Sequence, residues 1–180
     1  VKRYENSIIN YKKIEKLEGY KKKYALEKLY IENRFKELGV LSFKVSIARC
    51  FNFLGKYSLK DGQAIGKMIS EGLNKKVITI NNSDNVYRGY LNTDDLVNWL
   101  MVILKNSNKN CPIFNVGSDK SINLVLLGKK IAKIFNKKLK LKKLKKVKKN
   151  ENENDYYVPS IKKAKKLLKL KISINLNDSL

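Results

Sequence analysis

Residues 19–51, GYKKKYALEKLYIENRFKELGVLSFKVSIARCF, decide the fold of this chain. The first part, residues 19–38, repeats apolar side chains with the period of a helix, and Gly39 is expected to end that helix. The last part, residues 43–51, alternates apolar and polar side chains, as a half-buried strand does. A helix followed directly by a strand predicts an α/β fold with at least partly parallel strands.

The same alternation continues toward the C-terminus. We predict helices at residues 63–73, 93–104, 124–135 and 160–168, strands at 77–80 and 113–116, and capping side chains at Thr93 and Ser160. We also predict a loop at 52–62, a turn at 81–84, a polar linker at 150–155 and an ordered edge or docking segment at 172–180. Helices and strands therefore alternate along most of the chain.

The composition allows a globular core and excludes several classes of protein. The 180 residues are 43% apolar and 31% charged, which is enough for one or two small domains. The sequence has no histidine, which excludes Ser-His-Asp and Cys-His catalytic sites and histidine-bearing zinc sites, and we predict no metal site. The lone cysteines Cys50 and Cys111 fit reduced thiols, and no apolar run has the length of a membrane span. These features predict a cytoplasmic protein without a membrane partner.

The net charge of +24 has two interpretations. A lysine-rich run at residues 137–149 is typical of a nucleic-acid patch. Only four of the 40 basic residues are arginines, however, and proteins that bind phosphate groups also use arginine forks. Leu139 and Leu141 alternate with lysines, as in a half-buried edge strand. We therefore attribute most of the charge to drift toward lysine, and a nucleic-acid-binding module stays open as a lower-ranked alternative.

One pair of residues in the first helix has chemistry of its own. The i,i+4 spacing puts Tyr24 and Lys28 on one helix face. That face continues through Ile31, Phe35 and Leu38 and is predicted to lie toward the core. A tyrosine that acts as a base near neutral pH needs its pKa lowered by about three units, and an ammonium group about 4 Å away supplies roughly that much. The pair is therefore a candidate general acid/base with its electrostatic partner; an amphipathic helix with a snorkelling lysine is the alternative.

Including the segment that carries this pair, five segments occur in the order in which one family has them: YALEKLYIEN (Tyr24–Asn33), RCFNFLG (Arg49–Gly55), RGYLNTDDLV (Arg88–Val97), FNVGS (Phe114–Ser118) and the closing stretch Tyr157–Leu180. Together they resemble the extended short-chain dehydrogenases/reductases, the nucleotide-sugar epimerase/dehydratase family. The resemblance implies the C-terminal part of a Rossmann-type parallel sheet plus a small α/β substrate-binding domain.

The resemblance also implies a role for each of five residues. Tyr24 would take the proton of the sugar 4-hydroxyl as hydride passes to NAD, and Lys28 would hydrogen-bond the nicotinamide ribose and lower the pKa of Tyr24. Phe51 would lie beside the nicotinamide. Asn52 and Arg88 would bind the diphosphate of a nucleotide-diphosphate sugar. The implied activity is that of an NAD-dependent nucleotide-sugar epimerase or 4,6-dehydratase.

The chain also departs from the family pattern. It contains no G-x-G-x-x-G, and the family's catalytic Ser or Thr would precede Val1. Gly89 stands where the family has an acidic residue. We therefore expect a fragment, about the C-terminal half of such an enzyme, that alone binds NAD poorly and is inactive. Residues 1–57 would be the end of the NAD-binding domain, and residues 58–180 the substrate domain, with some segments returning to the first. A remnant that only associates with other subunits is a further alternative.

A second apolar patch lies about half a turn from the Tyr24 face of the first helix. It consists of Leu26, Leu29 and Tyr30, and the two patches together are too wide for a single buried face. The family's dimers pair this helix across a two-fold axis, so the resemblance implies a homodimer. Burial of the patch within the same chain is the alternative.

Overall fold

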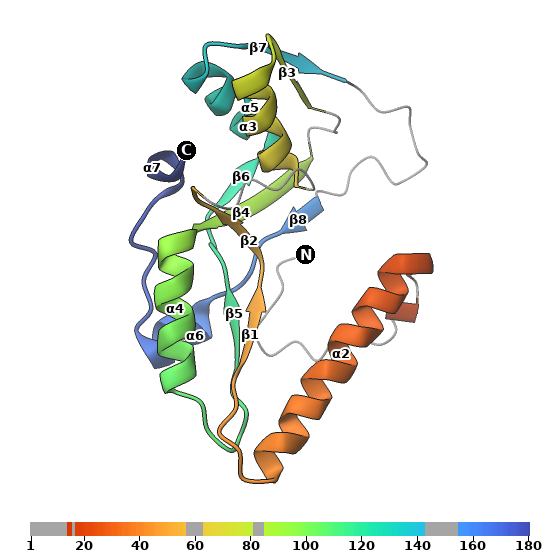
Figure 1. Cartoon of the computed structure of the whole chain (residues 1–180), viewed down its shortest axis with the longest axis vertical. Coiled ribbons are helices and arrows are strands. Elements are labelled where there is room, and N and C mark those ends of the chain that lie inside the picture. Colours follow the sequence, from red (N-terminus) through yellow and green to blue (C-terminus); the bar gives the residue numbers. More distant parts are fainter. Residues whose placement is uncertain (1–13, 16, 57–62, 81–84, 143–154) are drawn as a thin grey trace.

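The computed structural model describes residues 14–15, 17–56, 63–80, 85–142 and 155–180 (Figure 1). In chain order its elements are α2 (Gly19–Val40), β1 (Ile47–Cys50), β2 (Asn52–Leu54), α3 (Ala64–Asn74), β3 (Val77–Ile80), β4 (Val86–Asn92), α4 (Thr93–Lys105), β5 (Ile113–Val116), β6 (Ser121–Asn123), α5 (Leu124–Ile134), β7 (Lys138–Leu141), β8 (Asp155–Tyr157), α6 (Lys162–Leu168) and α7 (Leu176–Ser179). Among these elements, four strand pairs are parallel and one is antiparallel. The predicted α/β class is confirmed.

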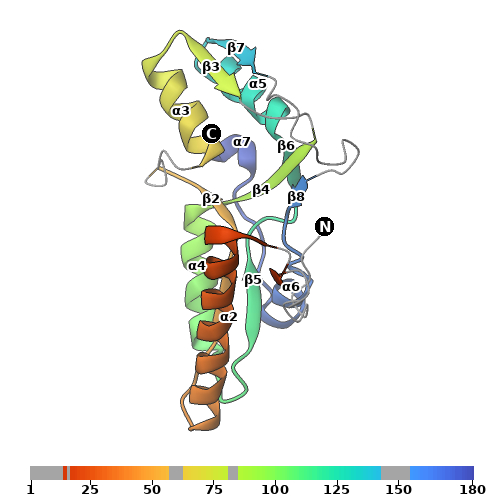
Figure 2. The ribbon, with the colours of Figure 1, turned by 90° about the vertical axis from the view of Figure 1, so that its right-hand side faces the viewer.

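One end of the molecule is a pair of parallel strands with a helix on each side. β1 pairs with β5, from Ile47 opposite Ile113 to Cys50 opposite Val116. In both views of the ribbon, α2 lies on one side of this pair and α4 on the other (Figure 1 and Figure 2). Parallel strands are stable when both faces are covered. The first core consists of the buried residues Leu91, Trp99, Ile103, Phe114, Val116, Ile161, Ala164 and Leu170.

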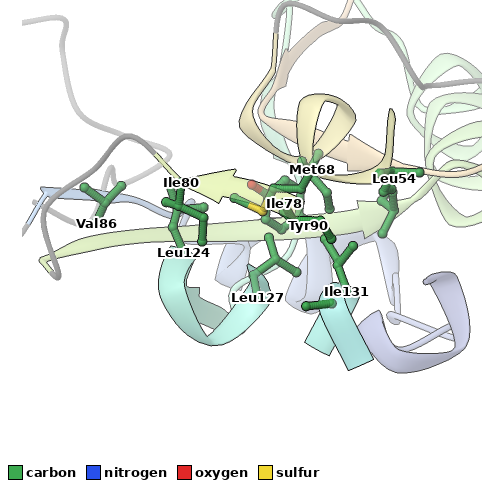
Figure 3. Packing of buried hydrophobic residues seen from close by; sticks show 12 residues of the cluster. Leu54, Met68, Ile78, Ile80, Val86, Tyr90, Leu124, Leu127 and Ile131 are labelled. Carbon is green, nitrogen blue, oxygen red and sulfur yellow. The ribbon is translucent and has the colours of Figure 1, made fainter. Parts of the chain in front are cut away.

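The other end is built from the remaining strands and two amphipathic helices. β4 lies between β2 and β6 and also pairs with β8, whereas β3 pairs with β7. The apolar side chains of α3 and α5 meet those of β3 and β4 (Figure 3). The second core consists of the buried residues Leu54, Ile65, Met68, Ile69, Ile78, Ile80, Val86, Tyr90, Leu124, Leu127, Ile131 and Ala132.

The C-terminal segment is ordered and docks on the rest of the chain, as predicted for residues 172–180. Asp95, in the first turn of α4, is only 2% exposed and accepts hydrogen bonds from the backbone N–H groups of Ser173 and Ile174 at 2.9 and 3.0 Å. A buried carboxylate needs such donors. Beyond this anchor, the last leucines of the chain pack against the second core.

The regular elements with clear periodicity were predicted closely. The strands at 77–80 and 113–116 are confirmed, and the helices at 63–73, 93–104 and 124–135 are confirmed to within one residue at each end. These three helices are strongly amphipathic, so the apolar face alone predicts their positions in the sequence. Within the described ranges, no helix combines the length and the apolar character that a membrane crossing requires.

Several other predictions about the elements are wrong. Residues 52–54, predicted as loop, form β2, and the strands β4, β6 and β8 were not predicted. The expected strand at 43–51 is regular only from Ile47 to Cys50. Short strands whose pairing comes from distant segments leave little periodicity in their own sequence. The turn at 81–84 and most of the linker at 150–155 lie outside the described residues.

The helix ends also differ from the prediction. The side chain of Asn92, not of Thr93, caps α4, accepting from the N–H of Asp94 at 2.8 Å. α6 begins after Ile161 without a side-chain cap, so Ser160 is not its cap. Gly39 does not end α2.

The role of Gly39 is instead a close approach between two segments. A Cβ at this position would lie 2.4 Å from the backbone oxygen of Lys109. Any larger residue would push the end of α2 away from the loop before β5.

The lysine-rich segment forms the predicted edge strand over its described part. β7 runs parallel to β3 in a two-stranded sheet, with Leu139 partly buried against the second core and Lys138 and Lys140 exposed. Leu141, expected to face inward, is 48% exposed. Residues 143–149 of the run lie outside the described residues.

Candidate active site

The orientation of α2 differs from the prediction. The face expected to lie toward the core is open to solvent, with Tyr24 49%, Ile31 44% and Phe35 44% exposed. The face that meets the chain instead carries Leu29, which is 9% exposed, and Glu32. The helix is apolar on several sides, so its periodicity does not select one face.

An ion pair explains which face of α2 turns inward. The guanidinium of Arg49 in β1 donates to both carboxylate oxygens of Glu32, at 2.8 and 2.7 Å, and both side chains are mostly buried. Such a bidentate pair has a fixed geometry. It holds α2 against β1 at the point where the strand approaches its carboxyl end.

Tyr24 and Lys28 share one face of α2, as their spacing predicts. The Lys28 ammonium nitrogen lies 5.5 Å from the centroid of the Tyr24 ring. Lys28 also acts on the end of β1. Crowding desolvates the otherwise exposed Cys50 thiol and raises its pKa, while the positive charge of Lys28 opposes this rise. The positive charge of Lys28 therefore acts on Cys50, the residue that precedes Phe51.

Phe51 lies at the carboxyl end of the β1–β5 pair. Its backbone N–H donates to the oxygen of Val116 at 2.9 Å, one residue beyond the paired strands. Its ring lies 4.9 Å from the ring of Tyr157, centroid to centroid. Ligands of open parallel sheets bind at the carboxyl ends of the strands. Phe51 therefore occupies the edge at which a cofactor is expected.

Asn52 and Arg88 lie on neighbouring strands. Parallel pairing puts Asn52 opposite Tyr90, and the Asn52 side-chain amide donates to the oxygen of Gly89 at 3.4 Å. The Arg88 guanidinium carbon lies 6.0 Å from the ring centroid of Tyr157. The structure thus brings Phe51 and Arg88 together against Tyr157, with Asn52 beside Gly89, the residue after Arg88. Tyr24 and Lys28 form a separate pair on α2.

Sequence reasoning gave neither Tyr157 nor Asp155 a role in the site. The guanidinium of Arg88 donates to the carboxylate of Asp155 at 2.8 Å and to its backbone oxygen at 2.9 Å. The signal in the sequence was the aromatic pair after the polar linker, where Tyr156 stacks on Tyr87. Only the pairing of β8 with β4 places Tyr157 and Asp155 beside Arg88.

The departure at Gly89 has a steric cause. A Cβ at this position would lie 2.3 Å from the backbone oxygen of Ser118. The acidic residue that the resemblance leads one to expect between Arg88 and Tyr90 therefore does not fit here without a shift of the backbone.

Tyr90, unlike Tyr24, is a buried tyrosine. Burial raises the pKa of Tyr90 to about 12, an effect that the Arg88 charge opposes. The phenol of Tyr90 stays protonated at neutral pH and belongs to the second core. Tyr24, by contrast, is 49% exposed and has the Lys28 ammonium beside its ring.

Comparisons with known proteins agree with this architecture. The model of the NAD dependent epimerase/dehydratase family matches residues 7–117 of the chain. A dTDP-glucose 4,6-dehydratase from Streptomyces venezuelae, solved with NAD bound, superimposes with a TM-score of 0.73 and 16% identity over 99% of this chain and 52% of its own. The RMD structure from Pseudomonas aeruginosa, complexed with NADPH, superimposes with a TM-score of 0.72 and 21% identity over 87% of this chain and 52% of its own.

A third similar structure is a UDP-glucose 4-epimerase from Thermotoga maritima, solved with UDP-glucose. Its TM-score is 0.67, with 20% identity over 89% of this chain and 50% of its own. At these identities the similarities show a shared fold. The chain spans about half the length of each of the three structures. A search of curated protein sequences gives no match.

Proposed function

Because the chain belongs to the NAD dependent epimerase/dehydratase family, we propose that it takes part in an NAD-dependent reaction at C4 of a nucleotide-diphosphate sugar, as an epimerase or a 4,6-dehydratase. The observation that carries this proposal is the placement of Phe51 and Arg88 against Tyr157, with Asn52 beside Gly89, at the carboxyl end of β1 and β5. Two of these three residues carry side-chain donors suited to phosphate oxygens.

The residues present fit the nicotinamide end of NAD. Phe51 follows the end of β1, the positive charge of Lys28 acts on Cys50 at that end, and Lys28 lies beside the accessible ring of Tyr24. Lys28 would hydrogen-bond the nicotinamide ribose, and Phe51 would contact the nicotinamide. When bound, NAD accepts a hydride from the sugar. The sequence contains no G-x-G-x-x-G to hold the pyrophosphate, so we expect weak NAD binding by these 180 residues alone.

The chain's own residues would perform two tasks in the reaction. The Tyr24 phenolate would accept the proton of the sugar 4-hydroxyl as the hydride leaves C4, and the Lys28 ammonium would stabilise the negative charge of that phenolate before the proton arrives. Asn52 and Arg88 would bind the diphosphate and so orient the sugar toward Tyr24.

We assign residues 1–57 to the NAD-binding part and residues 58–180 to the substrate part. α4, β5 and α6 return to the first part, because their side chains share the first core, against which Ala48 of β1 packs. The substrate part is centred on the second core.

Binding of UDP-glucose and dTDP-glucose tests the proposal. We expect calorimetry to show that Arg88→Gln weakens the binding of the preferred nucleotide sugar at least about tenfold, because a charge-assisted hydrogen bond contributes roughly 1.5–3 kcal/mol. Arg34→Gln is the matched control, since Arg34 makes an exposed ion pair with Glu37 on α2. Equal affinities of the wild type and Arg88→Gln would contradict the role of Arg88.

A further inference from the structure

Arg88, the proposed diphosphate ligand, already holds an anion in this structure. One terminal nitrogen donates to the backbone oxygens of Tyr87 and Asp155, at 2.8 and 2.9 Å, and the other donates to the Asp155 carboxylate at 2.8 Å. A carboxylate and a phosphate present the same pair of acceptor oxygens to a guanidinium fork. The Asp155 carboxylate therefore occupies the guanidinium nitrogen of Arg88 that a phosphate oxygen would need as its donor.

The register of the sheet creates this contact. β8 runs parallel to β4, with Tyr157 opposite Arg88 and Asp155 opposite Val86. Residues two apart on a strand point to the same face, so Asp155 and Arg88 share a face as diagonal neighbours. The backbone N–H of Asp155 also donates to the oxygen of Asn85 at 2.7 Å. The pair is thus set by backbone pairing, unlike a chance encounter of two long surface side chains.

The two partners differ in how easily they can leave. The Arg88 side chain is 23% exposed and is held by two backbone oxygens and by the ring of Tyr157. The Asp155 side chain is 63% exposed and can rotate into water. Displacement of the carboxylate would leave the guanidinium in place, still oriented by the backbone oxygens.

We infer that Asp155 competes with the diphosphate of the substrate for Arg88 and thereby lowers the affinity of the site for nucleoside diphosphates. The inference rests on the proposed function, because it takes Arg88 as the diphosphate ligand. Asp155 acts on the substrate only through its hydrogen bond with Arg88. Its carboxylate is the group that an incoming phosphate replaces.

The test is calorimetric titration of the full chain with UDP and dTDP. We expect Asp155→Asn to bind the preferred nucleotide about two- to fivefold more tightly than the wild type, the range typical of an exposed ion pair. Glu37→Gln is the matched control, since it removes one negative charge from an exposed arginine ion pair on α2. Its affinity should equal that of the wild type. Circular dichroism of each variant checks that it is folded.

A double variant separates competition from simple charge repulsion. If Asp155 acts by occupying Arg88, the gain from Asp155→Asn disappears when Arg88 is glutamine. A gain that persists in Arg88→Gln, or an affinity that Asp155→Asn leaves unchanged or weakens, would overturn the inference. An affinity that depends on Arg88 but not on Asp155 contradicts the inference alone. An affinity that does not depend on Arg88, or the absence of binding in every variant, contradicts the proposed function as well.

Discussion

Arg88 shows how single residues in this chain receive their orientation from the backbone. Two of its hydrogen bonds go to main-chain oxygens, and its neighbour Gly89 passes so close to Ser118 that a side chain there would collide with the backbone oxygen. The guanidinium is therefore placed by the packing of β4 against β8 and the loop after β5. Because the guanidinium of Arg88 has a fixed position, a binding role can be inferred from its contacts, whereas the contacts of a mobile surface arginine carry little energy.

Tyr24 carries the chemistry of the proposed reaction. We expect Tyr24→Phe to lower the rate of nucleotide-sugar conversion at least about 100-fold, because general acid/base catalysis contributes roughly that much or more. The substitution removes only the hydroxyl, so UDP-glucose binding should change little. The assay uses the chain supplied with the glycine-rich NAD-binding half of a family member, with products separated by chromatography.

Tyr20 provides the control for this experiment. It lies one turn earlier on α2, is 78% exposed, and has its ring 6.1 Å from that of Tyr24. Tyr20→Phe should leave the rate unchanged. Conversion by Tyr24→Phe at the wild-type rate would rule out the proton-transfer role.

At the scale of elements, the turn from α3 into β3 depends on a buried carboxylate. Glu71 accepts from the N–H of Thr79 at 2.6 Å and from the Lys75 ammonium at 3.3 Å. Burial alone would raise the pKa of Glu71, but these donors outweigh it and hold the pKa below its ordinary value. The helix end and the strand are thus joined by an ionised side chain.

The lowered pKa of Glu71 has a consequence for stability at acid pH. A carboxylate with a lowered pKa in the folded state stabilises the protein above the unfolded pKa of about 4.3, and this contribution is lost as the pH falls through the folded value. At neutral pH we expect Glu71→Gln to lower the free energy of unfolding by about 1–2 kcal/mol, and the difference from wild type to shrink below pH 4. Urea denaturation at several pH values measures both effects.

Glu37→Gln is a suitable comparison for Glu71→Gln, because Glu37 makes an exposed ion pair with Arg34. Its effect on the free energy of unfolding should stay below about 1 kcal/mol. A difference between wild type and Glu71→Gln that stays constant from pH 7 to pH 3 would show that ionised Glu71 does not stabilise the turn.

At the scale of the whole molecule, α2 exposes several large apolar side chains. Leu29 of the second apolar patch packs within the chain, but Leu26 and Tyr30 are 42% and 65% exposed. Burial within the chain thus accounts for one residue of the patch. We propose that a second copy of the chain covers the rest, as a homodimer through α2.

Sedimentation measures this association. We expect the wild type to sediment as a dimer at micromolar concentration and Tyr30→Asp as a monomer, because a buried carboxylate without a partner opposes association. Leu104→Asp is the control, since Leu104 has the same 65% exposure and belongs to α4, the helix on the other side of β1 and β5 from α2 (Figure 1 and Figure 2). A wild type that stays monomeric, or a loss of the dimer in Leu104→Asp alone, would contradict pairing through α2.

The sequence by itself determined the α/β class and the amphipathic helices, because each of these helices has a local apolar period. It also placed the strands at 77–80 and 113–116, which are short, largely apolar runs between polar or turn-forming residues. It also determined the candidate residues Tyr24, Lys28, Phe51, Asn52 and Arg88 through their order along the chain. Which face of α2 turns inward was decided only in the tertiary structure. The Glu32–Arg49 ion pair selects among faces that are nearly equally apolar.

The same holds for the strands around the candidate site. β2, β4 and β8 are defined by pairing between segments far apart in sequence, and such pairing leaves no period within any one of them. For that reason the contact between Arg88 and Asp155 could not be predicted from the sequence. The sequence supplies the chemical groups of the site, and the register of the strands decides which of them meet.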